Sequence, residues 1–277
     1  MLLSGLLLAS ILCYTSMALP TSNSTYETRG IHKRSLPKIA PGFTDRQVQQ
    51  INDGFADALE LASYVVNQPW DQVEPIMSKY FNPRDYPTVK SVFNNILGGD
   101  PSQGNVRLGD ITVHPDFPDP SNDGKLTCNT KDNLMAQLRD QPDLEHPIII
   151  LCDSAFTHGG IGKGYGSIPL FNVPAVACGN FDDRVSWKMD TLGSTLLHEY
   201  THWARLVAPP LLQGTKDYGY GAWKCQGLDR VEAARNADSY SWVATEVLWT
   251  SICNKKYQLA IEEDDRDPGC GLLSCFR

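Results

Sequence analysis

The chain of 277 residues lacks several patterns that would assign it to a common class of protein. It has no Cys-x-x-Cys pair, which argues against a thiolate zinc ribbon and against a thioredoxin-type redox site. Ser154 stands in Cys-Asp-Ser-Ala-Phe rather than in a Gly-x-Ser-x-Gly turn, so a serine hydrolase is disfavoured. The glycines of residues 157–181 lack the Gly-Lys-Ser or Gly-Lys-Thr ending of a phosphate-binding loop. No internal repeat is visible.

Positive charge is also scarce. The first 34 residues hold three of the 24 basic and one of the 32 acidic side chains, so the remaining chain has 21 against 31 and a net charge of −10. Nucleic-acid phosphates need a basic footprint, and a nucleic-acid partner is therefore not expected. After the N-terminus no apolar run is long enough to cross a membrane, so no membrane association is predicted.

The N-terminus has the features of a leader. Residues 2–14 form an apolar run too short for a confident membrane span, and small residues follow at the spacing that signal peptidase favours. We predict a signal peptide over residues 1–18 and hence a secreted, extracellular protein; the alternative is a buried helix. The polar residues 19–34 end in Lys33 and Arg34, a dibasic pair, which indicates a pro-segment or else an uncut arm. One catalytic domain is expected over residues 35–277.

Cysteine usage fits an oxidising compartment, where disulfides form. Cys13 lies in the predicted signal peptide, so seven cysteines remain: Cys128, Cys152, Cys178, Cys225, Cys253, Cys270 and Cys275. An odd number requires at least one free thiol or one bond to another chain. The spacing does not determine which cysteines pair.

Apolar periodicity predicts helices in the first part of the chain. Thr44 and Gln47 form a capping box, and apolar residues follow at three- and four-residue steps until residues 67–69. Shorter helices are predicted over residues 71–81 and 88–97.

The second part of the chain mixes strands, loops and helices. β-Branched runs predict strands within residues 105–116 and 146–156, and the glycine- and proline-rich residues 157–181 are expected to be mostly loop. Long helices are predicted over about 186–207 and 229–255, followed by a solvated acidic segment at 262–267. The pattern predicts an α+β fold in which a helix-rich N-terminal part packs against a small mixed sheet.

Two histidines lie four residues apart in Leu-Leu-His-Glu-Tyr-Thr-His. On a helix this spacing projects His198 and His202 from one face, so their ring nitrogens can converge on one cation. Glu199 lies about 100° round the axis, close to such a cation without having to bind it. The opposite face is expected to pack on the core and carries Leu196, Tyr200, Trp203 and Val207.

A hydrolytic zinc site uses three protein ligands and keeps the fourth position for water. Residues 203–208 lack the further histidine that a metzincin would place there. Three candidates for the third ligand remain: Glu232 and Glu246 on the next predicted helix, and Asp217.

The segment after the paired histidines carries a second motif. It fits Gly-Thr-x-Asp-x-x-Tyr-Gly at Gly214, Thr215, Asp217, Tyr220 and Gly221. Together with the upstream His-Glu-x-x-His, it resembles the deuterolysin-like zinc endopeptidases, or aspzincins, which are largely secreted fungal enzymes. Residues 236–244 are similar to the helix that follows the motif in that family. The resemblance covers about residues 190–245.

The resemblance implies a zincin-like domain with one zinc ion held by His198, His202 and Asp217. It makes Glu199 the general base and Tyr220 the donor to the oxyanion. It implies a secreted zinc-dependent metalloendopeptidase, a hydrolase that cleaves peptide bonds with a metal-activated water. Substrates are expected to be proteins or peptides, with basic ones favoured, and the enzyme is expected to be a monomer.

Other interpretations remain open. A secreted zinc-binding or host-interaction protein without proteolytic activity would need the ligands but neither Glu199 nor Tyr220. A small disulfide-linked surface protein would carry the paired histidines by coincidence. Asp238 either orients a ligand histidine or makes a helix-packing hydrogen bond, and Tyr218 either lines the cleft or packs. The other histidines after residue 34 lack a ligand partner at helical spacing: His114, His146 and His158.

Overall fold

The computed structural model describes residues 36–100, 104–129, 134–140, 144, 146–157 and 174–265. The predicted signal peptide, the predicted pro-segment, His158, Cys270 and Cys275 lie outside the described residues. All described residues belong to the unit Lys33–Arg277. Among them, no helix combines the length and the apolar character that a membrane crossing requires.

The three predicted N-terminal helices are confirmed as α1 (Asp45–Asn67), α2 (Trp70–Tyr80) and α3 (Tyr86–Leu97). Helix α1 begins at the predicted capping box. The Thr44 hydroxyl accepts from the Gln47 amide at 3.3 Å, and the Gln47 side chain accepts from the Thr44 amide at 2.9 Å. Because two otherwise unpaired donors are satisfied at once, the first turn is fixed locally.

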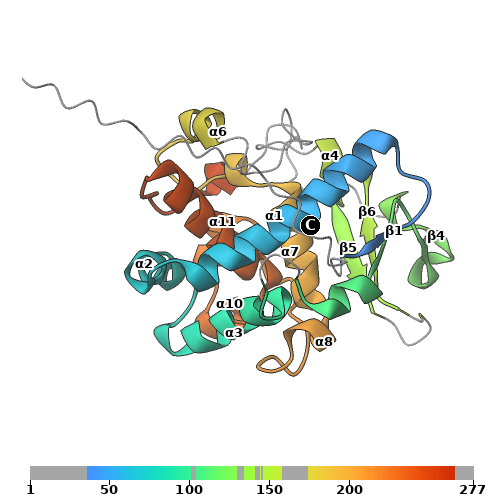
Figure 1. Cartoon of the computed structure of the whole chain (residues 1–277), viewed down its shortest axis with the longest axis horizontal. Helices are drawn as coiled ribbons and strands as arrows, with labels where there is room; N and C mark the ends of the chain where they lie inside the picture. The colour runs from blue at the N-terminus through green and yellow to red at the C-terminus, as the bar shows by residue number, and fades with distance from the viewer. Residues whose placement is uncertain are drawn as a thin grey trace, which may run out of the picture. The chain divides into compact units, whose positions relative to one another are not determined.

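Helix α1 packs against α7 (Leu192–His202), α3 and α11 (Ala237–Cys253). Figure 1 shows α1 running from the side of the sheet to α2. The close approach to α7 requires a glycine, since a Cβ on Gly193 would lie 2.5 Å from the Cβ of Asp57. The buried face of α1 includes Ile51, Phe55 and Leu61, so α7 is supported along its length by the main core.

A four-stranded mixed sheet has the order β1-β2-β6-β5. Strands β1 (Lys38–Ile39), β2 (Thr112–His114) and β6 (Ile148–Leu151) are parallel, whereas β5 (Ala136–Arg139) is antiparallel to β6 and forms one edge. The predicted strands are confirmed as β2 and β6. Residues 106–110 instead form a 3-10 helix, and β1 and β5 were not predicted. The α+β fold with a small mixed sheet is thus confirmed.

A small hairpin, β3 (Pro118–Asp119) and β4 (Lys125–Leu126), supports the edge strand β5. The buried guanidinium of Arg139 donates to the Pro118 carbonyl at 2.7 Å and to the Thr127 hydroxyl at 2.8 Å, and pairs with Asp119 at 3.3 Å. The Cys128–Cys152 disulfide ties the same hairpin to the end of β6. Strand β5 is therefore held from outside the sheet as well as by β6.

The prediction of one long helix over 186–207 is wrong. A 3-10 turn η6 (Trp187–Met189) precedes α7, and an extended Trp203 separates α7 from α8 (Ala204–Val207). The Thr215 amide donates to the Thr201 carbonyl at 3.0 Å. That carbonyl is therefore taken by the chain that crosses the end of the helix, and α7 stops there.

The second long helix is interrupted by the same crossing chain. Asp229 caps α10 (Arg230–Ala233), and α11 starts only at Ala237. Between the two, the Lys216 amide donates to the Arg235 carbonyl at 2.8 Å and the Lys216 carbonyl accepts from the Ala237 amide at 2.9 Å. Tertiary hydrogen bonds thus replace helical ones at both interruptions.

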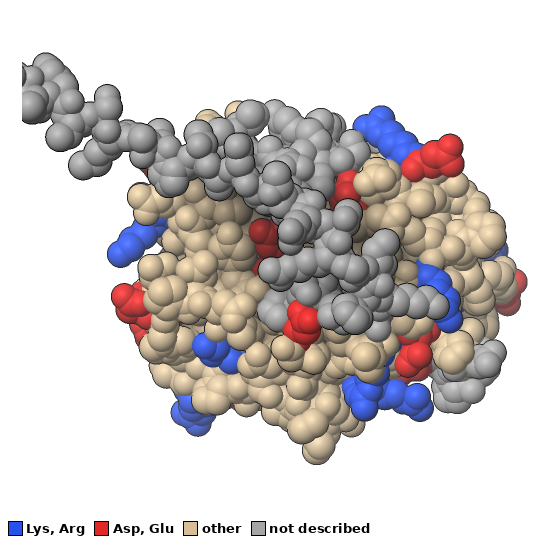
Figure 2. Space-filling model, viewed as in Figure 1, with Lys and Arg blue, Asp and Glu red and all other residues tan. Residues whose placement is uncertain are grey.

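The remaining helices are short: α4 (Asp153–Thr157), α6 (Pro174–Asn180), α9 (Ala222–Gly227) and η7 (Glu262–Asp265). Helix α6 lies in the segment 157–181 that was expected to be mostly loop, of which residues 158–173 lie outside the described residues. In the predicted acidic segment Glu262 and Glu263 are exposed, but Asp265 is half-buried. A second disulfide joins Cys178 to Cys253, and Cys225 is a buried free thiol, as the odd count allowed. On the face drawn in Figure 2, basic and acidic side chains of described residues lie interspersed.

Candidate metal centre

Helix α7 carries the paired histidines at the centre of the described structure. His198 is fully buried and Glu199 is 1 % exposed, while His202 is half-buried. The four residues predicted to face inward, Leu196, Tyr200, Trp203 and Val207, are all buried, but only Leu196 and Tyr200 lie on α7. The polar face is covered in turn by β5 and by the chain after α8.

The structure brings Asp217 to the two histidines. The Nε2 atoms of His198 and His202 lie 3.0 Å apart, and Asp217 Oδ1 lies 3.1 Å from the first and 3.2 Å from the second. A tetrahedral zinc site with bonds of about 2 Å has ligand–ligand edges of about 3.3 Å. The three atoms therefore form a triangle close to one face of such a tetrahedron, and the group can hold a metal ion.

The two glutamates considered for the third position lie elsewhere. Glu246 is buried in α11 and is bonded to the Lys79 ammonium and, at 3.0 Å, to the Tyr80 hydroxyl. Glu232 lies in the first turn of α10. Neither belongs to the His198, His202 and Asp217 group.

Each histidine ring is oriented through its other nitrogen. His198 Nδ1 lies 2.7 Å from Asp238 Oδ1, and His202 Nδ1 lies 3.1 Å from the Thr215 carbonyl oxygen. An acceptor at Nδ1 places the proton there and leaves the Nε2 lone pair for a cation. Asp238 therefore orients a candidate ligand, which was one of its two expected roles.

The carboxylates around His198 and His202 give this group the negative charge that is typical of a cation-binding site. Burial opposes protonation of His198, but Asp217 and Asp238 raise its pKa to about 10. Burial likewise opposes ionisation of Asp217, yet its hydrogen bonds to both histidines hold the pKa of that carboxyl well below its usual range. Negative charge thus surrounds the imidazoles, as a divalent ion would require.

The turn that carries Asp217 is held by Asn236, which sequence analysis did not single out. The buried Asn236 amide oxygen accepts from the Tyr218 and Gly219 amides at 2.8 and 3.1 Å, and its nitrogen donates to the Gly219 carbonyl at 3.0 Å. Its place in the Asn-Ala-Asp segment next to Asp238 was the only indication in the sequence.

Glu199 lies directly beside the triangle. Its Oε2 accepts from the Leu138 amide of β5 at 2.5 Å. Burial, with Asp217 adding to it, raises the pKa of Glu199 above the usual value, and the two histidines oppose that rise. A raised pKa makes this carboxylate a better proton acceptor than an ordinary glutamate.

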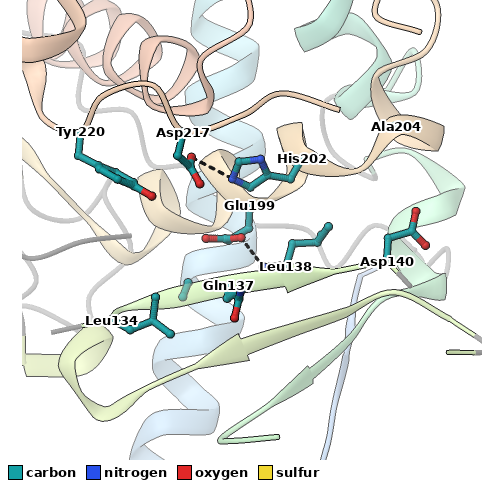
Figure 3. Close-up of a pocket in the computed structure, with 10 residues that line it drawn as sticks. Leu134, Gln137, Leu138, Asp140, Glu199, His202, Ala204, Asp217 and Tyr220 are labelled. Atoms are coloured by element: carbon teal, nitrogen blue, oxygen red, sulfur yellow. Dashed lines mark hydrogen bonds and ion pairs between the residues drawn. The ribbon is translucent and has the colours of Figure 1, made fainter. Parts of the chain in front are cut away.

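Tyr220 follows Asp217 by three residues and lines the same cleft. Its ring is nearly parallel to that of His198, with an interplanar angle of 15° and centroids 6.0 Å apart. Burial and the nearby Asp217 raise the pKa of the phenol far above its usual value, so the phenol stays protonated and can donate a hydrogen bond. Figure 3 shows its hydroxyl directed toward the space beside Asp217 and Glu199.

These side chains open into a cleft of about 350 Å³ (Figure 3). Strand β5 forms one wall and α7 the other, and the lining residues are Leu134, Ala136, Gln137, Leu138, Asp140, Glu199, His202, Ala204, Asp217 and Tyr220. Tyr218 is not among the described residues that line it. His114 is also elsewhere, on β2 with its ring against Phe117, where burial lowers its pKa.

The comparison with known proteins gives a partial similarity. No family model matches the chain. A protein of Uncinocarpus reesii named "Neutral protease 2 homolog" is 38 % identical over 55 residues. These residues are 20 % of this chain and 14 % of the relative, so the chain matches about a seventh of that protein's length. The similarity is thus to a stretch of a protein named as a protease.

Proposed function

We propose that the chain is a secreted zinc-dependent endopeptidase of the deuterolysin type. In this proposal His198, His202 and Asp217 hold one zinc ion. The observation that carries the proposal is the triangle of ligand atoms with a buried carboxylate, Glu199, beside it in a cleft. The partial similarity to a protein named as a neutral protease supports it.

The chemistry follows from the positions of the side chains. When bound, zinc acts as a Lewis acid and lowers the pKa of a coordinated water to about 7. Glu199 takes a proton from the attacking water and returns it to the leaving amine. Tyr220, kept as a neutral phenol, donates to the oxyanion that develops on the former carbonyl. Asp238 and Thr215 keep the imidazole Nε2 atoms available throughout.

The cleft also suggests how a peptide binds. Among the described strands β5 pairs with β6 alone, and it lines the cleft, so an extended substrate can add to its other edge as a further strand, next to the Leu138 amide that is bonded to Glu199. Asp140, at the end of β5 beside Ala204, exposes a carboxylate to the cleft (Figure 3). This charge favours substrates with a basic side chain at that end. The two disulfides fit export from the cell.

The proposal includes the organisation of the precursor. Residues 1–18 are removed as a signal peptide, residues 19–34 act as a pro-segment, and residues 35–277 form the catalytic domain, which works as a monomer.

Replacement of the base tests the mechanism. Wild type and Glu199→Gln are compared on a mixed peptide library, and zinc content is measured for both. We expect equal zinc and a loss of cleavage of about 10²-fold or more, since Gln cannot take the proton. Glu263→Gln removes an exposed carboxylate and serves as the matched control.

The outcomes separate the alternatives. Cleavage that persists in Glu199→Gln would show that another group is the base. A wild-type protein that binds zinc and cleaves nothing would support a zinc-binding role without proteolysis. A protein with neither zinc nor cleavage would make the paired histidines incidental.

A further inference from the structure

The turn that follows Tyr220 is capped by a residue far away in the chain. Helix α9 has no side-chain cap from its own N-cap residue, Gly221. Instead Asp265, at the end of η7, accepts from the Trp223 amide at 2.9 Å and from the Lys224 amide at 3.0 Å. One carboxylate thus satisfies two of the free amides in the first turn of α9.

The same carboxylate packs on the residue directly after Tyr220. A Cβ on Gly221 would lie 2.4 Å from Asp265 Cγ, and the φ of Gly221 is +85°. The Gly221 amide donates to Asp238 Oδ2 at 2.7 Å, and Asp238 Oδ1 is the atom bonded to His198. Gly221 therefore lies between two carboxylates, one of which orients a candidate zinc ligand.

Holding Asp265 in this place has an electrostatic cost. Burial raises the pKa of Asp265 to about 7, against the lowering effect of the Trp223 and Lys224 amides, and Asp238 raises it further. Burial raises the pKa of the Cys225 thiol on α9, and the negative charges of Asp238 and Asp265 add to that rise. In contrast, the neighbouring Glu263 is exposed. Asp265 is bonded to the first turn of α9, directly after Tyr220 and Gly221.

We propose that Asp265 is a positioning residue for the peptidase reaction. By fixing residues 221–224, it sets the place of the Tyr220 phenol against His198 and Asp217. Asp265 is neither in the His198, His202 and Asp217 group nor among the residues that line the cleft, and it acts through Tyr220. The inference rests on the proposed function, because only in that reaction does the phenol meet a substrate.

A double-mutant cycle tests whether Asp265 acts through Tyr220. Asp265→Asn and the control Glu263→Gln are made in the wild type and in Tyr220→Phe, and kcat, KM and zinc content are measured. We expect Asp265→Asn to lower kcat about tenfold with KM nearly unchanged and full zinc, because a small displacement of the donor weakens oxyanion stabilisation. In Tyr220→Phe the same change should have no further effect. An equal loss in both backgrounds, or no loss in the wild type, would overturn the proposal.

Amide hydrogen exchange gives a second measurement that needs no catalysis. In Asp265→Asn the Trp223 and Lys224 amides should lose protection, and the Gly221 amide should lose it with them. Retained protection at Gly221 would show that the cap does not reach the turn after Tyr220. If the wild type shows no cleavage that depends on Glu199, the proposed function fails, and the exchange at Gly221 still decides the role of Asp265 in the turn.

Discussion

The imidazoles of His198 and His202 differ in how their Nδ1 atoms are held. His198 faces the carboxylate of Asp238, whereas His202 faces the neutral carbonyl of Thr215. A carboxylate partner raises the basicity of the ligand nitrogen more than a carbonyl does. In the proposed site His198 is therefore the stronger donor, and Asp217, which is shared by both rings, supplies the negative charge that a divalent ion needs.

The choice of third ligand can be tested directly. Asp217→Ala removes the oxygen that completes the triangle, so we expect the purified protein to lose its stoichiometric zinc. Glu246→Gln should keep it, because Glu246 is bonded to Lys79 and Tyr80 rather than to the histidines. Zinc content after gel filtration distinguishes the two. Zinc retained in Asp217→Ala and lost in Glu246→Gln would reverse the assignment.

Sequence spacing could predict part of this site. The relation of the paired histidines to Glu199 follows from helical geometry alone, because the two histidines lie about one turn apart on one helix and Glu199 is next to the first. The same geometry could not choose among Asp217, Glu232 and Glu246, since Glu246 is satisfied by a lysine 167 residues away. The hydrogen bond from the Leu138 amide to Glu199 could not be predicted from spacing either, because it joins residues 61 positions apart.

At the scale of helices and strands, local sequence patterns predict an element correctly when interactions between nearby residues determine where it begins and ends. The capping box and the periodic face of α1 specify its start and its buried side without reference to other elements. The interruptions at Trp203 and before α11 depend instead on backbone groups of residues 215–216, which take carbonyls and amides that a continuous helix would use. Strands β1 and β5, with the sequences Lys-Ile and Ala-Gln-Leu-Arg, lack the β-branched runs by which β2 and β6 were predicted.

The contact between α2 and α11 makes stability depend on pH. Burial raises the pKa of Glu246 from 4.5 to about 7, although Lys79 opposes the shift. The folded protein therefore holds a proton that the unfolded chain has lost between about pH 4.5 and pH 7, so this group's contribution to stability falls as pH rises through that window. Glu246→Gln removes the effect.

Urea unfolding at pH 5 and pH 7.5 measures this difference. Wild type should lose on the order of 1–3 kcal/mol relative to Glu246→Gln between the two pH values. Glu263→Gln, which is exposed, should follow the wild type. Parallel pH profiles for wild type and Glu246→Gln would mean that Glu246 keeps an ordinary pKa in the folded protein.

At the scale of the whole molecule, the two disulfides close loops of different length. Cys128–Cys152 spans 24 residues and ties the hairpin to β6, whereas Cys178–Cys253 spans 75 residues and ties α6 to the end of α11. Loop-closure entropy assigns them about 3.5 and about 4.5 kcal/mol. The disulfide that closes the longer loop should therefore contribute more to stability. The disulfide that closes the shorter loop anchors the hairpin that supports β5, one wall of the cleft.

Replacing each pair by serine separates these contributions. The Cys178→Ser/Cys253→Ser protein should melt about 2–4 °C below the Cys128→Ser/Cys152→Ser protein, the shift that about 1 kcal/mol produces in a domain of this size. For peptide cleavage we expect the opposite ranking, with the larger loss of activity in the Cys128→Ser/Cys152→Ser protein. Without the Cys128–Cys152 disulfide, the hairpin whose Pro118 carbonyl accepts from Arg139 is held less firmly. Strand β5, which carries Arg139, lines the cleft and donates the Leu138 amide to Glu199, then loses part of its support. Glu263→Gln, an exposed position outside both disulfide loops, serves as the control. If both double variants lost stability and cleavage in the same proportion, the hairpin would have no separate role in holding the cleft.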